Sequence, residues 1–595
     1  MHLPPTRVAA RVLPLIAALL PFAGCHTPIH TTPVALVAAD QTPAGPFVTA
    51  TAPPETNPAA AARPADWLAL GREQHHRGLA PRQPAAARRA HHLAAAVYAW
   101  QALASAPTTT EHQAAGLLYR RALTLAFAAS PTPGTALDLN ATAFSWPDTG
   151  AGCAIVAGAM PASLQTAQRF LPADAFEPHG LFEHTVLPGL GVPLIAEFPP
   201  APAGFTRTAA ANLLARAEGT PADFAAGRGR LVLDLHIPAD QEQLALFGRT
   251  EPLAYDLSSP AAYALNNERI WKLGRAHFLD SRQRVPTGLY LHQPHRPGRI
   301  PVVLVHGTLS SPLTWVQLIN SLQADPLLRE RFEFWLFVYN SGNPVSYSAD
   351  LLRSALAAKR AELDPTGSDP ALGQLVLVGH SQGGLLVKLQ AVASGDALWR
   401  ALSDRPYDPT HYPPAYRELI ARSFFLEPAP GVRRVVFMAT PHHGTRIARS
   451  FVSSLARPLL DLPGDLAQAA LNFQQDSAVK LPPKLRRRIP SSLDGMSPTN
   501  PWLLALADLP VAPGIAAHSI IGIKDDTPPP GGTDGVVTYA SAHLEPVESE
   551  LVVRGKHGLP RNRAAIAELR RILHTHLTAA DAPATHSAPS PHAAN

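Results

Sequence analysis

Apolar runs alternate with helix-like segments through the second half of the chain. PVVLVHG (301–307) and QLVLV (374–378) are almost continuously apolar, and each precedes a stretch whose apolar residues lie three or four positions apart. Strands without a polar face need cover on both sides, as in a parallel sheet flanked by helices. The pattern predicts an α/β fold with a mostly parallel central sheet over 298–578. Further strands are expected at 334–340, 433–439, 518–523 and 550–554, and helices at 312–324, 348–363, 385–393 and 563–577.

The preceding region has two different patterns. In 65–134 the apolar residues recur at helical spacing with breakers between them, which predicts three helices. In 135–297 short apolar runs such as RLVLDLHI (230–237) are mixed with many glycines and prolines, which indicates a mixed, β-containing region. Neither region carries a motif that indicates its role.

The two ends of the chain have a composition unlike that of a folded core. Residues 26–64 are rich in Pro, Ala and Thr without a period, which is typical of an extended tether. Residues 579–595 are again Ala, Pro and His, and we expect a disordered tail there. Much of the excess of proline, 63 in 595 residues, lies in such linkers and loops.

Residues 1–25 have the layout of an export signal. Two arginines precede an apolar run from Val12 to Leu20, and small residues then lead to Cys25. FAGC (22–25) resembles the lipobox of bacterial lipoproteins, which implies that Cys25 is lipidated and becomes the new N-terminus. The protein would then be exported and anchored in a membrane of the cell envelope, facing the periplasm or the exterior. Ordinary secretion with cleavage nearby is the alternative.

Length, charge and cysteine content narrow the function classes. A chain of 595 residues is too long for one ordinary core, so at least two folded units are expected. The formal net charge is only +5, and no basic stripe with interleaved aromatic residues is present, which argues against nucleic-acid binding. Cys25 and Cys153 are the only cysteines, so no disulfide framework is expected. No feature indicates an oligomeric state.

The stretch LVLVGHSQGG (375–384) carries the main chemical signal. Ser381 falls between a predicted strand and a predicted helix, at the carboxyl end of the sheet, where ligands gather in such folds. A serine on a sharp strand-to-helix turn has strained backbone angles, and Gly379 and Gly383 would relieve the crowding around it. This context favours a nucleophile elbow over an inert glycine-rich turn.

Four motifs in order resemble the α/β-hydrolase family, in particular its bacterial lipase and esterase branch. They are VHGTLSS (305–311), GHSQGG (379–384), ATPHHGT (439–445) and TDGVVTYASAHLEPVESELVVRGKHGL (533–559). The resemblance implies that Ser381 is the nucleophile, Asp534 the acid and His557 the general base, in the chain order of this fold. Asp525 and Asp526, directly after a predicted strand, are alternatives for the acid. His543 is interpreted as structural.

The resemblance also implies two backbone donors for an oxyanion. They are the N–H of Gln382 and the N–H of Thr308, with Leu309 possible if the turn differs. The adjacent histidines His442 and His443 would point apart, and no carboxylate or cysteine lies at ligand spacing, so no metal is expected. Gly558, Leu559 and Pro560 follow His557 where some relatives carry a calcium-binding aspartate. No cofactor is therefore predicted.

Three functions remain open at this stage. The first is hydrolysis of carboxylic esters, with an ester or lipid substrate, through an acyl-enzyme. The second is transfer of the acyl group to an alcohol or lipid on the same scaffold. The third is a non-catalytic interaction protein of the cell envelope. The interval 445–510 is expected to carry a cap over the site or an ordinary helical insertion.

Overall fold

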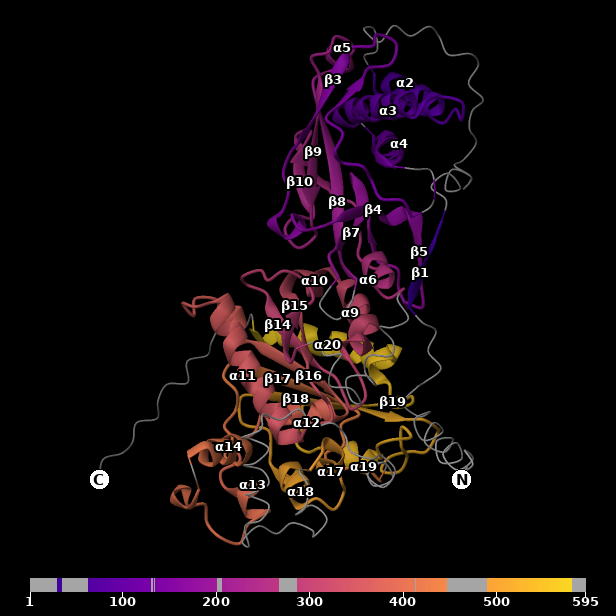
Figure 1. The fold of residues 1–595 in the computed structure, drawn as a ribbon. Helices are drawn as coiled ribbons and strands as arrows, with labels where there is room; N and C mark the ends of the chain where they lie inside the picture. The colour runs from indigo at the N-terminus through magenta and orange to yellow at the C-terminus, as the bar shows by residue number, and fades with distance from the viewer. Residues whose placement is uncertain are drawn as a thin grey trace, which may run out of the picture. The chain divides into compact units, whose positions relative to one another are not determined.

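The computed structural model describes residues 29–34, 63–266 and 286–580, apart from 107, 130–131, 133, 201–205, 413 and 447–489. The chain divides near residue 270 into two compact units, and each is considered by itself (Figure 1). The predicted export signal with Cys25 lies outside the described residues. None of the helices in the described ranges is long and apolar enough to cross a membrane.

The C-terminal unit is built on a seven-stranded sheet with the order β13-β15-β14-β16-β17-β18-β19. All neighbouring strands are parallel except the edge strand β13, which is antiparallel to β15. The strands are β13 (Gly288–Leu291), β14 (Ile300–Val305), β15 (Phe332–Val338), β16 (Leu375–His380), β17 (Val432–Met438), β18 (Ala516–Ile523) and β19 (Ser549–Arg554). The predicted α/β fold with a mostly parallel sheet is confirmed.

Helices cover this sheet. They are α9 (Val316–Gln323), α10 (Pro326–Arg331), α11 (Val345–Leu363), α12 (Gln382–Lys388), α13 (Ala397–Arg400), α14 (Pro414–Phe424), α17 (Ser492–Gly495), α18 (Pro501–Asp508), α19 (Tyr539–Ala542) and α20 (Arg563–Ala580). α20 packs against α9 and α10, whereas α11 packs against α12 and α14 (Figure 1). The predicted cap interval, 445–510, is described only at its two ends, the second of which contains α17 and α18.

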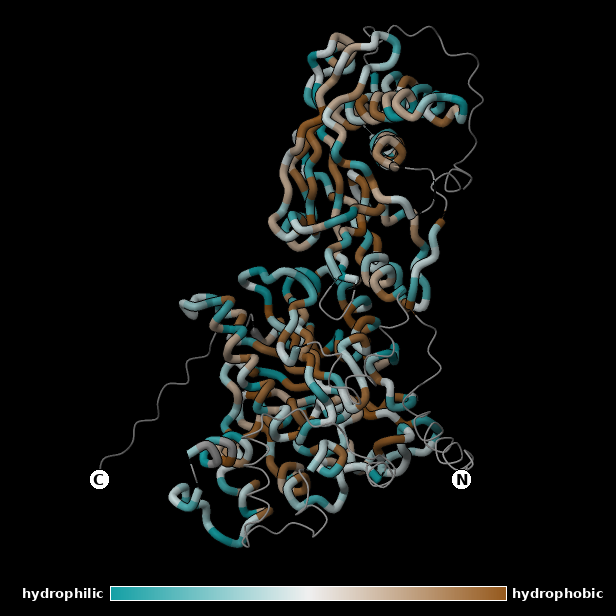
Figure 2. The backbone as a smooth tube through the Cα atoms, in the orientation of Figure 1, coloured by the Kyte–Doolittle hydropathy of each residue, from teal (hydrophilic) through white to brown (hydrophobic). Residues whose placement is uncertain are grey.

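Burial explains why the strands are so apolar. Every residue of β14 and of β16 is buried, as expected for parallel strands with helices on both faces. Figure 2 shows the same hydrophobic colouring along the central strands. β13 differs because it is a short edge strand whose sequence, GLYL, alternates between buried and more exposed positions. It lies before residue 298, so the sheet begins earlier than the expected start of the domain.

A cluster of buried polar side chains lies at the amino ends of the central strands. Arg434 near the start of β17 contacts His518 of β18, and its Nε donates to His576 Nδ1 of α20 at 3.3 Å. Glu548, just before β19, lies 3.3 Å from the Arg434 guanidinium. Burial and the nearby Arg434 charge lower the pKa of His518 and of His576 to about 4, so both rings are neutral acceptors at neutral pH.

The N-terminal unit contains the three predicted helices packed beside a mixed sheet. The helices α2 (Pro64–Gly78), α3 (Ala85–Ser105) and α4 (Thr109–Phe127) pack on one another, and α3 and α4 also contact the sheet. The sheet order is β2-β3-β9-β8-β7-β4, with only β3 and β9 parallel. Its strands are β2 (Ala143–Ser145), β3 (Gly152–Ala157), β4 (Arg169–Pro172), β7 (Val192–Phe198), β8 (Arg207–Glu218) and β9 (Arg230–His236).

Shorter elements complete this unit. β1 (His30–Pro33), which lies inside the predicted tether, pairs with β5 (Phe176–His179), so part of that segment is a strand of the folded unit. The others are β6 (Val186–Leu187), β10 (Gln243–Leu246), β11 (Arg249–Pro252), β12 (Tyr255–Asp256), α5 (Pro221–Ala225) and α6 (Ser259–Ala264). The second cysteine, Cys153, is a buried free thiol in β3.

Candidate active site

Ser381 occupies a strained turn between β16 and α12. Its backbone has φ 55° and ψ −126°, a conformation that side-chain-bearing residues rarely adopt. The glycines beside it are required by close approach. A Cβ on Gly379 would lie 2.5 Å from the Gly384 backbone, and a Cβ on Gly383 would lie 2.2 Å from the Val305 carbonyl oxygen. The turn therefore has the geometry of the predicted elbow.

The structure brings Ser381, His557 and Asp534 together from three separate loops. His557 Nε2 lies 2.9 Å from Ser381 Oγ, and His557 Nδ1 lies 2.6 Å from Asp534 Oδ2. All three follow the carboxyl ends of strands: β16, β19 and β18. Their exposed fractions are only 7%, 6% and 3%. A hydroxyl, an imidazole and a carboxylate in this linear contact can pass a proton from the serine to the histidine.

Asp534 is held as a carboxylate by its surroundings. Its Oδ1 accepts the backbone N–H groups of Val536 and Val537, at 2.7 and 2.8 Å. Burial by itself raises the pKa of Asp534, but the His557 charge and hydrogen bond, together with those two N–H groups, hold the pKa below its ordinary value. Asp534 is therefore a carboxylate at neutral pH.

The two alternative aspartates lie elsewhere. Asp525 is exposed and accepts the N–H of Thr527 at 3.3 Å, and Asp526 forms an exposed ion pair with Arg554 at 3.0 Å. His543, the competing histidine, is held by Glu550 at 2.7 Å and by Tyr539. Of the candidates for acid and base, Asp534 and His557 are the two that contact each other, and His557 in turn contacts Ser381.

The two predicted oxyanion residues face each other across the elbow. Thr308 Oγ1 donates to Gln382 Oε1 at 2.6 Å, which joins their side chains. Within the described residues, no acceptor lies in hydrogen-bond range of the backbone N–H of Thr308 or of Gln382. The N–H of Leu309, the alternative donor, is already donated to Ser341 Oγ at 3.1 Å. Thr308 and Gln382 therefore offer two unoccupied donors beside Ser381.

His380 joins the elbow to the histidine loop, a contact that the sequence analysis missed. Its Nε2 donates to the carbonyl oxygen of His557 at 2.7 Å, and the two rings lie 4.9 Å apart. Burial, with the neighbouring His557, lowers the pKa of His380 to about 3, so the ring is neutral and a single N–H makes this bond. Its place directly before Ser381 was the one sequence signal for this role.

The paired histidines after β17 lie in different surroundings. His442 is fully buried against Phe437, whereas His443 is exposed, so the two rings point apart as predicted. Among the described residues no three His, Cys, Asp or Glu side chains are grouped as metal ligands.

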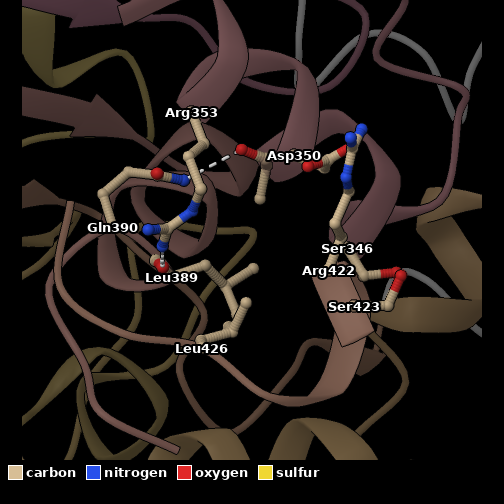
Figure 3. A pocket seen from close by; sticks show the side chains of 9 residues that line it. Ser346, Asp350, Arg353, Leu389, Gln390, Arg422, Ser423 and Leu426 are labelled. Atoms are coloured by element: carbon tan, nitrogen blue, oxygen red, sulfur yellow. Dashed lines mark hydrogen bonds and ion pairs between the residues drawn. The ribbon is translucent and has the colours of Figure 1, made fainter. Parts of the chain in front are cut away.

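A narrow pocket lies at the opposite end of α12 (Figure 3). It is lined by residues of α11, by residues in and just after α14, and by Leu389 and Gln390 after α12. The polar groups in it serve the fold: Arg353 donates to the carbonyl oxygens of Leu389 and Glu427, each at 2.7 Å, and Gln390 donates to that of Ala349 at 3.0 Å. None of the predicted site residues lines it.

Comparison with known proteins gives one family match and several similar solved structures. Residues 302–571 match the model of the alpha/beta hydrolase family. No curated protein matches the sequence. Three similar solved structures are the mature lipase BlEst2 of Bacillus licheniformis, the butyrate-bound esterase Est2 of Thermogutta terrifontis and the phospholipase PlaB of Legionella pneumophila.

The structural likeness is distant. Sequence identity to these three proteins is 15%, 16% and 14%, and the TM-scores are 0.29, 0.27 and 0.26. The aligned regions cover 49%, 50% and 47% of this chain and 99%, 90% and 64% of the three structures. The sequence match over residues 302–571, together with the mostly parallel sheet, shows that this part of the chain has the alpha/beta hydrolase fold.

Proposed function

We propose that this protein is a serine hydrolase that cleaves carboxylic esters through an acyl-enzyme. The observation that carries the proposal is the contact of Ser381 Oγ with His557 Nε2 at 2.9 Å, backed by Asp534 at 2.6 Å on the other ring nitrogen. Two unoccupied backbone donors lie beside that hydroxyl. The family match supports hydrolysis in general, and these residues support attack on an acyl carbon in particular.

In the first half-reaction Ser381 Oγ attacks the ester carbonyl carbon, and His557 Nε2 takes the hydroxyl proton. The carbonyl oxygen becomes an oxyanion, which the N–H groups of Thr308 and Gln382 stabilise. Asp534 keeps the His557 ring in the tautomer that accepts at Nε2 and balances the charge of the imidazolium. The bond to the alcohol then breaks, and the alcohol leaves with the proton from His557.

In the second half-reaction water enters in place of the alcohol. His557 removes a proton from the water, whose oxygen attacks the acyl carbon of the ester on Ser381. The same two N–H groups hold the second oxyanion. When it collapses, Ser381 recovers its proton from His557 and the carboxylic acid is released. An alcohol or lipid that took the place of water would turn the same cycle into acyl transfer.

Labelling with a fluorophosphonate, followed by peptide mapping, tests the nucleophile. We expect the label on Ser381, and Ser381→Ala should lose both labelling and at least about 10⁴-fold in turnover of p-nitrophenyl esters. Ser519→Ala, which removes a buried hydroxyl from β18, is the matched control and should retain both. A folded, unlabelled protein without ester turnover would favour the non-catalytic interaction protein, and products formed on an added alcohol would favour acyl transfer.

We also propose that the protein is exported and anchored through Cys25. The support is the sequence of residues 1–25, with two arginines, an apolar run and FAGC. Expression of the full chain in a bacterium fed a labelled fatty acid should give a labelled membrane-bound form, and Cys25→Ser should lose the label. Labelling that persists in Cys25→Ser would contradict the anchor, as would wild-type protein recovered entirely in the soluble fraction.

A further inference from the structure

The turn that carries Thr308 is held on both sides by the loop after β15. On one side the Tyr339 hydroxyl donates to the His306 carbonyl oxygen at 2.8 Å, with the two rings stacked at 4.6 Å. On the other side Ser341 Oγ accepts the N–H of Leu309 at 3.1 Å. These two contacts bracket Gly307 and Thr308, so the direction of the Thr308 N–H depends on them.

Leu309 needs an outside contact to keep its conformation. Its φ is 57°, in the left-handed region that a leucine side chain disfavours. The N–H of Ser310 closes the turn on the Gly307 carbonyl oxygen at 3.3 Å, and an acceptor placed opposite the Leu309 N–H holds the leucine in that turn. Ser341 supplies that acceptor, so its hydroxyl fixes the peptide plane that follows Thr308.

Ser341 is itself firmly placed. It is 3% exposed, and its carbonyl oxygen accepts the hydroxyl of Ser492 at 2.6 Å. The N–H of Ser492 donates to the carbonyl oxygen of Gly342 at 3.1 Å, and the Gly342 N–H donates to Asn340 Oδ1 at 2.9 Å. Ser492 is the first residue of α17 and is fully buried, so the loop is anchored to a helix.

We propose that Ser341 is a positioning residue for the oxyanion donor Thr308. The inference rests on the proposed function, because it assigns a role within the same ester hydrolysis. Ser341 touches no reacting atom. It holds Leu309, Leu309 sets the turn, and the turn aims the Thr308 N–H, while the Gln382 side chain holds Thr308 from the elbow side. A donor aimed in advance stabilises the transition state more than the bound ester, so losing Ser341 should lower kcat and spare KM.

Ser341→Ala is the direct test. We expect kcat for p-nitrophenyl esters to fall about 10-fold, less than the 10²–10³-fold seen when an oxyanion donor is removed outright, with KM within about twofold. Affinity for a trifluoromethyl ketone, whose adduct with Ser381 carries an oxyanion, should fall by a similar factor. The pH dependence of kcat should stay unchanged, because His557 and Asp534 are untouched. Ser341→Thr keeps the hydroxyl and should restore most of kcat.

Two further variants separate positioning from folding. Ser519→Ala removes a buried hydroxyl in β18, far from the turn in sequence, and should leave kcat unchanged. Ser492→Ala keeps the Ser341 acceptor but removes its anchor, and should lower kcat by a smaller factor; it carries the test if Ser341→Ala does not fold. Unchanged kcat in folded Ser341→Ala, or equal losses in the alanine and threonine variants, would overturn the inference. An inactive wild type would instead overturn the proposed function.

Discussion

At the scale of single residues, the site depends on backbone shapes that most side chains avoid. Ser381, Leu309 and Ala439 all have positive φ, and each follows the carboxyl end of one of three neighbouring strands, β16, β14 and β17. Glycine would adopt these shapes without strain, but a nucleophile needs a side chain, so the surroundings must hold it. Close-packed glycines and long-range hydrogen bonds provide that hold around Ser381.

The choice between the three aspartates gives a sharp prediction at this scale. Asp534→Asn should keep the fold, since an amide oxygen can still accept the Val536 and Val537 N–H groups. It should nevertheless lower kcat about 10³–10⁴-fold, because an amide supports neither the required His557 tautomer nor the charge of the imidazolium. Asp525→Asn and Asp526→Asn change exposed side chains and should leave kcat within about twofold. Steady-state kinetics on the three variants shows which aspartate supports His557. Full activity in Asp534→Asn would exclude Asp534 as the acid.

At the scale of elements, a buried lysine joins the ends of two helices. Lys388 is the last residue of α12 and is fully buried, and its Nζ donates to the carbonyl oxygen of Ala507, in the last turn of α18, at 2.8 Å. A cation suits a helix carboxyl end, where carbonyl groups are unsatisfied. Burial nevertheless lowers the pKa of Lys388 to about 7, with the exposed Asp508 opposing that shift.

This lysine should make stability depend on pH. Between about pH 7 and 10.5 the unfolded chain holds a proton on Lys388 that the folded chain has released, so stability should rise with pH across that window. In Lys388→Met this contribution disappears, and the urea midpoint should change less between pH 7 and 9 than in the wild type. Lys524→Met, at an exposed site, is the control and should keep the wild-type slope. If the urea midpoint changed equally with pH in all three proteins, the pKa of Lys388 would not be lowered in the folded chain.

At the scale of the whole molecule, local pattern predicted every strand of the C-terminal sheet except the edge strand β13. The strands around Ser381 are mostly apolar, and the family resemblance pointed to Asp534 and His557, which the fold brings within hydrogen-bond distance of each other. The contacts of Ser341 and His380 could not be read in this way. Ser341 and Leu309 are 32 residues apart in the sequence, and His380 and His557 are 177 residues apart. The residues around a serine or a histidine do not indicate which distant group it will contact.

In the N-terminal unit, even more of the structure depends on long-range pairing that the sequence pattern does not predict. Its helices were predictable from spacing, but the six strands of its sheet follow an order that no local pattern encodes. The strand His30–Pro33 was missed because it lies in a Pro- and Thr-rich stretch, and it pairs with a strand almost 150 residues away. β13 was missed for a related reason: four residues of an edge strand give too little alternation to separate them from a loop.

The direction of the parallel strands has a consequence for anyone who wishes to redesign this enzyme. Ser381, His557 and Asp534 follow the carboxyl ends of strands, whereas the buried cluster of Arg434, His518 and His576 lies near the amino ends of β17 and β18. Effects of substitutions at sites that are distant from each other usually add. Substrate selectivity can thus be changed in the loops at the carboxyl ends of the strands, while thermal stability is improved independently near the amino ends.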